Sequence, residues 1–193
     1  MKRTTLGALL AFALLASFGQ DPAQEKKPLY DEEADGAVQI EAALVKARRH
    51  HKRVLIQWGG NWCRWCTRLD DVFTSDAKVR HELLYEYELV HVDIGRWDKH
   101  QDLTEKYGAD TKGKGVPYLT FLDGDGKLVA NEATDGLEQP DEKSRAAHDS
   151  EKVLALLEKH RAQRTKAEPL LKAALARAQK EEKGVFLLFG APW

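Results

Sequence analysis

Cysteine is scarce in this chain of 193 amino acids, which contains two, Cys63 and Cys66. Because they lie three residues apart in one motif, no cysteine is left over for a structural disulfide elsewhere. No cysteine lies near the N-terminal region where a lipoprotein signal would be cleaved, which excludes a lipid anchor at that point.

The sequence also lacks an excess of charge of either sign. Lysine and arginine number 30, aspartate and glutamate 31, and the formal net charge is -1. A nucleic-acid-binding surface needs clustered basic side chains. The composition therefore gives no reason to expect a nucleic acid as a partner.

No apolar run reaches the length of about 20 residues that spans a bilayer comfortably, so we favour cleavage of the N-terminal run over its retention as a membrane anchor. The run from Leu6 to Phe18 is shorter, follows Lys2 and Arg3, and ends near the small residues of Ser17-Phe18-Gly19. This order is typical of a cleaved secretory signal. We expect a signal peptide over residues 1–19 and a periplasmic or secreted protein with no membrane attachment after cleavage.

Two metal-binding patterns are incomplete. Cys63 and Cys66 supply at most half of a four-ligand zinc site, and the seven histidines show no paired spacing around them. The segment 123–126, Asp-Gly-Asp-Gly, resembles part of a calcium loop but lacks the bidentate glutamate that closes one. We interpret that segment as a hairpin turn, and we expect no metal and no bound cofactor.

Hydrophobic periodicity predicts alternating helices and strands. The apolar run Val54 to Trp58 has almost no alternation, as expected of a central strand covered on both faces. Before this strand we predict a helix that has a basic end at 48–53 and whose apolar face consists of Val38, Ile40, Ala43, Leu44 and Ala47. After the strand we predict helices that start at Cys63 and Asp76, a strand at 88–94 and a helix at 98–107 capped by Asp98. Hairpin strands at 118–122 and 127–129 and a helix from Ser150 complete the predicted order.

The motif Trp62-Cys63-Arg64-Trp65-Cys66 stands where the first strand gives way to a helix. There the first sulfur meets unpaired backbone N–H groups and the positive end of the helix dipole, which favour the thiolate. The second thiol lies one turn on and can displace a product from a mixed disulfide. The motif predicts a redox-active disulfide, with Cys63 as nucleophile and Cys66 as resolving thiol.

Over residues 37–160 this order and motif resemble the thioredoxin fold, an α/β fold with a central mixed sheet flanked by helices. The segment Gly115-Val116-Pro117, ahead of the hairpin, is similar to the cis-proline loop of that family. The resemblance implies that Pro117 is cis and packs beside the Cys63 sulfur, and that the backbone of Val116 pairs with a substrate peptide. We expect a linker over residues 20–35 and the thioredoxin-like domain over 36–163.

The sequence departs from thioredoxin at two places. Gln57 occupies the position of a buried carboxylate that takes the proton of the resolving thiol, and glutamine cannot accept a proton. Water or another carboxylate, such as Asp70, is then required. The pair Arg64-Trp65 replaces Gly-Pro, which adds a cation near the thiolate and an indole at the rim.

Two functions from different classes fit these residues. The first is an exported thiol–disulfide oxidoreductase that acts on protein disulfides or thiols and needs a redox partner protein. The second is a non-catalytic chaperone or adaptor that binds unfolded chains through its tryptophans. We interpret Trp62, Arg64 and Trp65 as substrate contacts and Trp58 as a core residue.

The C-terminal segment repeats the start of the domain. Residues 173–193 align without a gap to residues 42–62, with identical residues at Ala173, Ala174, Leu175, Ala178, Lys183, Val185, Gly190 and Trp193. We expect residues 164–193 to begin a truncated second thioredoxin-like repeat, with a helix at 170–183 and a strand at 185–189. The alternative is a C-terminal helix–strand extension packed on the first domain.

Overall fold

The computed structural model describes residues 27–139, 147–163 and 166–188. The predicted signal peptide at 1–19 lies outside the described residues. The elements are α1 (Gly36–His50), β1 (Arg53–Gly59), α2 (Arg64–Ser75), α3 (Ala77–Glu86), β2 (Tyr87–Asp93), α4 (Gln101–Lys106), α5 (Thr111–Lys114), β3 (Tyr118–Leu122), β4 (Leu128–Ala133), η1 (Asp135–Leu137), β5 (Glu138–Gln139), β6 (Ala147–His148), α6 (Ser150–His160) and α7 (Ala167–Lys180).

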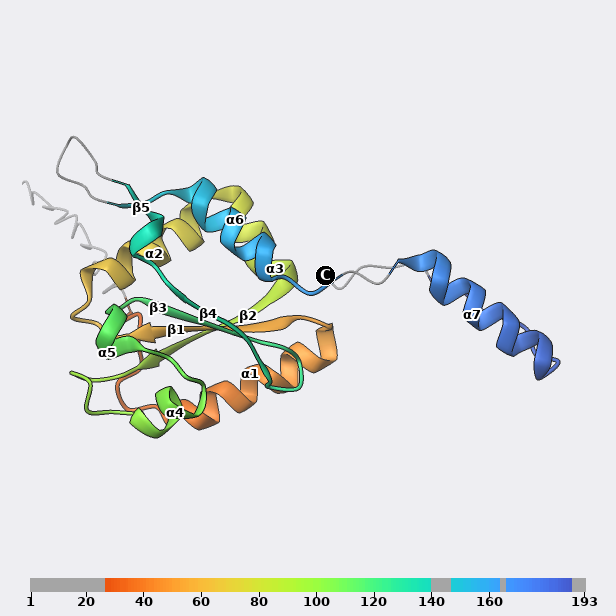
Figure 1. Ribbon diagram of the computed structural model, residues 1–193, viewed down its shortest axis with the longest axis horizontal. Coiled ribbons are helices and arrows are strands. Elements are labelled where there is room, and N and C mark those ends of the chain that lie inside the picture. Colours follow the sequence, from red (N-terminus) through yellow and green to blue (C-terminus); the bar gives the residue numbers. More distant parts are fainter. Residues whose placement is uncertain (1–26, 140–146, 164–165, 189–193) are drawn as a thin grey trace, which may run out of the picture.

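A mixed four-stranded sheet in the order β2-β1-β3-β4 forms the middle of the domain (Figure 1). Strand β1 pairs in parallel with β2 and antiparallel with β3, so the prediction of a central strand is confirmed. The turn between β3 and β4 is the predicted hairpin turn. The Asp123 carboxylate accepts hydrogen bonds from the amides of Asp125 and Lys127 and so closes it.

Helices cover both faces of the sheet (Figure 1). Side chains of α1 and α4 pack with Val54, Ile56 and Trp58 on one face, and side chains of α2, α3 and α6 pack with Leu55 on the other. Trp58 is fully buried, as predicted. Val38, which we placed on the apolar face of the first helix, is 65% exposed, because two residues turn a helix by about 200° and so place Val38 opposite the buried residues Gly36 and Ile40.

Aspartates start four of the helices. The carboxylates of Asp35, Asp76, Asp110 and Asp149 each accept a hydrogen bond from at least one backbone amide of the first turn, which satisfies otherwise unpaired N–H groups. The prediction that Asp98 caps a helix at 98–107 is wrong. Helix α4 begins later, after His100, and the Asp98 carboxylate accepts from the amide of Arg96 inside the preceding turn.

The described part of the predicted linker, residues 27–35, packs on the domain. Tyr30 is 1% exposed, and its backbone N–H and C=O both bond to the side-chain amide of Asn61. The folded unit therefore begins ahead of α1. The polar composition that suggested a linker belongs to the outward-facing neighbours of Tyr30.

The C-terminal segment contains the predicted helix but not the predicted strand. Helix α7 carries Pro169 in its first turn, where a proline costs no hydrogen bond. None of its residues is buried, and residues 183–188 form no strand. The alternative, an extension packed on the first domain, is therefore wrong for the described residues. The truncated second repeat stays a prediction. Residues 189–193 lie outside the described residues.

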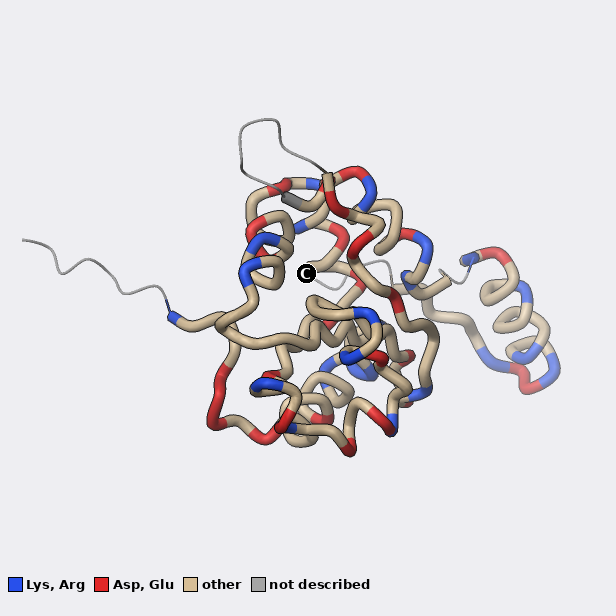
Figure 2. Tube along the Cα trace, turned by 60° about the vertical axis from the view of Figure 1, so that its left-hand side comes forward, with Lys and Arg blue, Asp and Glu red and all other residues tan. Residues whose placement is uncertain are grey.

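Basic and acidic residues are interspersed along the described chain (Figure 2). Within residues 27–139, 147–163 and 166–188, no helix combines the length and the apolarity that a membrane span requires.

Candidate active site

The two cysteines form a disulfide at the start of α2. Cys63 is the N-cap residue, with extended backbone angles, and the amide of Cys66 donates a hydrogen bond to its sulfur over 3.0 Å. This amide is one of the helix donors that have no partner within the helix. Cys63 retains 5% of its surface and Cys66 none, so Cys63 is the more accessible residue of the pair.

The loop before β3 lies against this disulfide. The Val116–Pro117 peptide bond is cis, as the family resemblance implied. The carbonyl oxygen of Val116 lies 3.6 Å from the Cys63 sulfur. Thr134 of the neighbouring strand end donates to the carbonyl of Pro117 and holds the loop in place.

Gln57 and Tyr30 lie beneath the disulfide on the inner side. The Gln57 side-chain amide donates to the Tyr30 hydroxyl over 2.8 Å and to the carbonyl oxygen of Cys66 over 3.3 Å. Both side chains are buried, and burial raises the pKa of the Tyr30 phenol, so the hydroxyl keeps its proton. Sequence reasoning found Gln57 from its position but missed Tyr30.

Gly59 allows these groups to meet. A Cβ atom on Gly59 would stand 2.5 Å from the Cys66 sulfur and 2.5 Å from the Tyr30 hydroxyl oxygen. Because both atoms lie that close to one point, they are neighbours, and the space between them exists only because the residue has no side chain.

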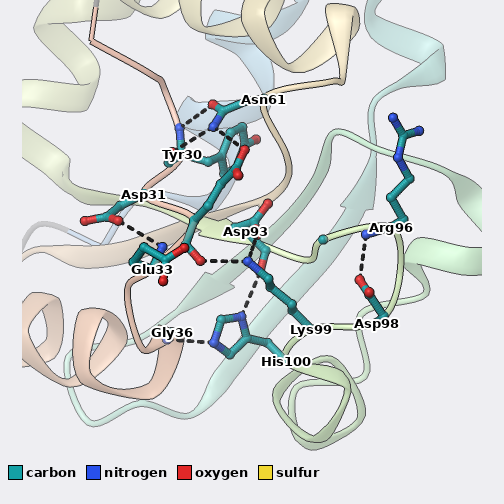
Figure 3. Close-up of polar contacts among 12 residues, drawn as sticks. Tyr30, Asp31, Glu33, Gly36, Asn61, Asp93, Arg96, Asp98, Lys99 and His100 are labelled. Carbon is teal, nitrogen blue, oxygen red and sulfur yellow. Dashed lines mark hydrogen bonds and ion pairs between the residues drawn. The ribbon is translucent and has the colours of Figure 1, made fainter.

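The segment carrying Tyr30 is tied to the loop after β2 as well as to Asn61 (Figure 3). The Lys99 ammonium donates to the carbonyl of Glu32 over 2.7 Å and pairs with the Asp93 carboxylate at 3.2 Å. The Asp93 side chain is 3% exposed, whereas Lys99 is exposed to solvent. The carboxylate of this ion pair is therefore buried and its ammonium group is solvated. These bonds fix Tyr30 under the disulfide.

The predicted substrate contacts lie around Cys63. Trp62 and Trp65 are each half-buried, and Arg64 is exposed. Trp62 packs against Trp97, with ring centroids 5.1 Å apart. The structure thus places an aromatic surface beside the disulfide, and the role of these residues in binding stays a prediction.

Asp70, named as a possible proton acceptor, lies one turn beyond Cys66 on α2. Its carboxylate stands 3.5 Å from the Nε2 atom of His91 on β2. The ring of His91 in turn packs edge-on against Tyr30, with centroids 5.5 Å apart. Asp70 therefore contacts His91, and His91 contacts Tyr30 beneath the disulfide.

The ring of His148 packs against the ring of Trp65. It is 2% exposed, its ring meets that of Trp65 at 5.3 Å, and neither ring nitrogen has a hydrogen-bond partner among the described residues. Burial, with a smaller contribution from Arg68, lowers the pKa of His148 to about 4. Sequence reasoning gave His148 no role, because its neighbours in the chain carry no motif.

The shift of His148 makes folding stability depend on pH. Between the ordinary value near 6.5 and about 4, the unfolded chain binds the proton and the folded chain does not. Stability should therefore fall as the pH drops through this window, by about 1–2 kcal/mol at pH 4.5. Urea denaturation at pH 7 and pH 4.5 measures this fall. His148→Phe should reduce it, and an equal fall in both proteins would contradict the assignment.

No group of three or more histidine, cysteine, aspartate or glutamate side chains that could hold a metal ion is present in the described ranges. The two sulfurs are bonded to each other.

Comparison with known proteins agrees with this geometry. Residues 36–124 match a family model described as thioredoxin-like. The chain is 28% identical over 97 residues to the disulfide bond reductase DsbH of Chlamydia pneumoniae, a match that covers 46% of this chain and 56% of that protein. The chain thus spans little more than half the length of this curated relative.

A solved structure gives a longer match. A disulphide isomerase from Xylella fastidiosa Temecula1 is 29% identical, with a TM-score of 0.56, and the match covers 68% of this chain and 95% of that one. The family match, the mixed sheet, the cysteine pair at the start of α2 and the cis proline beside it lead to one assignment. The chain has the thioredoxin fold, and its residues 36–124 are similar to thioredoxin-like proteins.

Proposed function

We propose that this protein is a thiol–disulfide oxidoreductase that acts on protein disulfides or thiols through Cys63 and Cys66. One observation carries the proposal. The Cys63 sulfur accepts a hydrogen bond from the amide of Cys66 at the start of α2, and its bonding partner in the oxidised form is Cys66 itself. This is the arrangement that stabilises an attacking thiolate and completes the exchange.

The reaction balances in two displacements. The Cys63 thiolate attacks one sulfur of a substrate disulfide, a mixed disulfide forms, and the other substrate sulfur leaves as a thiolate that takes a proton from water. The Cys66 thiolate then attacks the Cys63 sulfur, and the second substrate thiol departs. The substrate gains two electrons and two protons, and the protein is left with the Cys63–Cys66 disulfide.

The loop and the aromatic residues supply a place for the polypeptide substrate. Val116 has its carbonyl oxygen 3.6 Å from the Cys63 sulfur, so a peptide paired with this backbone would bring its own sulfur to Cys63. Trp62 and Trp65 flank that position with half-buried rings. Regeneration requires a redox partner protein that attacks the same Cys63–Cys66 disulfide.

Location follows from the N-terminal pattern. A basic pair, a short apolar run and small residues near position 19 are the parts of a secretory signal. We propose that the protein works in the periplasm or outside the cell, where disulfides form and persist.

An insulin assay tests the proposal. With dithiothreitol as electron donor, the full chain should accelerate precipitation of the insulin B chain by reducing the interchain disulfides. Incubation of Cys66→Ser with insulin should also leave a Cys63-linked mixed disulfide, which mass spectrometry detects, because the second displacement is removed. A rate equal to that of dithiothreitol alone, with no adduct, would contradict the proposal and favour a binding protein.

A further inference from the structure

The space under Cys66 contains an unusual pair of polar groups. Tyr30 comes from the segment ahead of α1, and Gln57 comes from β1. Both are buried and they are bonded to each other, with Gln57 as donor and the Tyr30 oxygen as acceptor. Most buried polar groups are hydrogen-bonded, yet the side-chain oxygen of Gln57 has no partner among the described residues.

The hydroxyl hydrogen of Tyr30 has no acceptor among the described residues. A phenol can donate one hydrogen bond and accept others, and the bond from Gln57 uses only its accepting capacity. The Cys66 sulfur is its neighbour across Gly59. In the oxidised protein that sulfur is bonded to Cys63 and accepts weakly, whereas a thiolate accepts strongly.

We propose that the Tyr30 hydroxyl donates a hydrogen bond to the Cys66 thiolate once the disulfide is reduced, with Gln57 holding the phenol in place. This inference rests on the proposed function and names a further catalytic residue for it. Tyr30 stabilises the resolving thiolate as a donor, in place of a carboxylate that would accept its proton. The proton released by Cys66 then passes through water to the departing substrate thiolate, so the second displacement stays balanced.

The charged groups around Tyr30 support the donor role. Burial is the main reason that the pKa of Tyr30 is raised, and Asp70 on α2 and Asp93 on β2 add to the rise because each disfavours a negative phenolate. His91, whose ring packs on Tyr30, faces Asp70, and Lys99 pairs with Asp93. With its proton retained, the hydroxyl has a hydrogen to give at every physiological pH.

A titration of Cys66 tests the inference without turnover. The chain has two cysteines, so Cys63→Ser leaves Cys66 as its single thiol, and the ¹³Cβ resonance of labelled cysteine reports its ionisation. Adding Tyr30→Phe removes the hydroxyl and keeps the ring. We expect the titration midpoint to rise by about one pH unit, which is about a tenfold lower thiolate fraction below the midpoint.

Tyr87→Phe in the same Cys63→Ser background is the matched control. Tyr87 is also buried, and its hydroxyl donates to the carbonyl of Leu157, in the core between β2 and α6. Its loss should leave the Cys66 midpoint unchanged. An unchanged midpoint with Tyr30→Phe, or an equal rise with Tyr87→Phe, would overturn the inference.

A second readout needs no substitution at Tyr30. In Cys63→Ser, the ¹³Cζ resonance of Tyr30 should move at the pH at which Cys66 ionises, because the hydrogen bond strengthens there. A flat resonance through that range would overturn the inference even if Tyr30→Phe did not fold. If the Tyr30 resonance follows Cys66 ionisation but the parent chain does not reduce insulin, the proposed function is wrong. If the parent chain reduces insulin but the Tyr30 resonance does not follow Cys66, the role proposed for Tyr30 is wrong.

Discussion

Cys63→Ser should reduce the insulin-reducing activity to the uncatalysed background, a loss of about 10³-fold or more. A serine hydroxyl stays protonated at neutral pH and cannot form a mixed disulfide, so the first displacement has no nucleophile. The substitution conserves size, and serine is a good N-cap for α2, so the fold should be unaffected. The turbidity rate with equal protein concentrations measures the loss.

Two comparisons separate this result from a folding defect. The circular dichroism spectrum of Cys63→Ser should match that of the reduced parent chain. Cys66→Ser should also lose turnover, but it should still accumulate the mixed disulfide that Cys63→Ser cannot form. If Cys63→Ser kept the parent activity, the assignment of the nucleophile would be wrong, and so would the redox function.

The second large effect is expected at Gly59. Gly59→Ala should destabilise the protein by about 2–3 kcal/mol, because the new methyl group would stand 2.5 Å from both the Cys66 sulfur and the Tyr30 oxygen. Neither can retreat easily, since the sulfur is covalently bonded to Cys63 and the phenol is pinned by Gln57. The expected fall in Tm is about 5–10 °C by differential scanning calorimetry.

Gly136→Ala is the matched control, because a Cβ atom there meets nothing within 4 Å and the backbone is not in the left-handed region. Its stability should stay within about 0.5 kcal/mol of the parent. Equal Tm values for Gly59→Ala and the parent would mean that the space under Cys66 is larger than the structure shows.

The parts of the site that could be predicted from the sequence are those that a short segment encodes. The cysteine spacing at a strand-to-helix junction places Cys63 at an N-cap whatever else surrounds it. The apolar run of β1 and the hairpin turn at Asp123 are equally local signals. The cis state of Pro117 was predictable from the family resemblance and not from the proline itself.

The parts that were missed depend on tertiary contacts. Tyr30 is a single buried aromatic in a polar stretch, so no periodicity marks it, and its partners are Gln57 and Asn61, about 30 residues away in sequence. His148 is buried through its contact with Trp65, which no local pattern reveals. Asp98 has the residue type of a helix cap, but its carboxylate accepts a hydrogen bond from the Arg96 amide in the preceding turn and does not cap α4.

The C-terminal segment illustrates the opposite limit. Its sequence carries the same helical periodicity as α1, and α7 forms on that basis alone. A strand needs a neighbouring strand to receive its backbone hydrogen bonds, and residues 185–188 have no paired strand in the described structure. Local propensity was sufficient for the helix and insufficient for the strand.

The position of Tyr30 ahead of α1 also affects how this chain is compared with related proteins and where it can be truncated. The family match starts at residue 36, so the Tyr30 part of the floor beneath the disulfide is contributed by a stretch that the matched region does not include. Two members with the same sheet and the same cysteine motif could thus acquire different chemistry at the buried sulfur by exchanging only this leading stretch. A fragment trimmed to the matched boundary would keep the nucleophile and lose the phenol, and a recombinant version intended for redox measurements should begin upstream of Pro28.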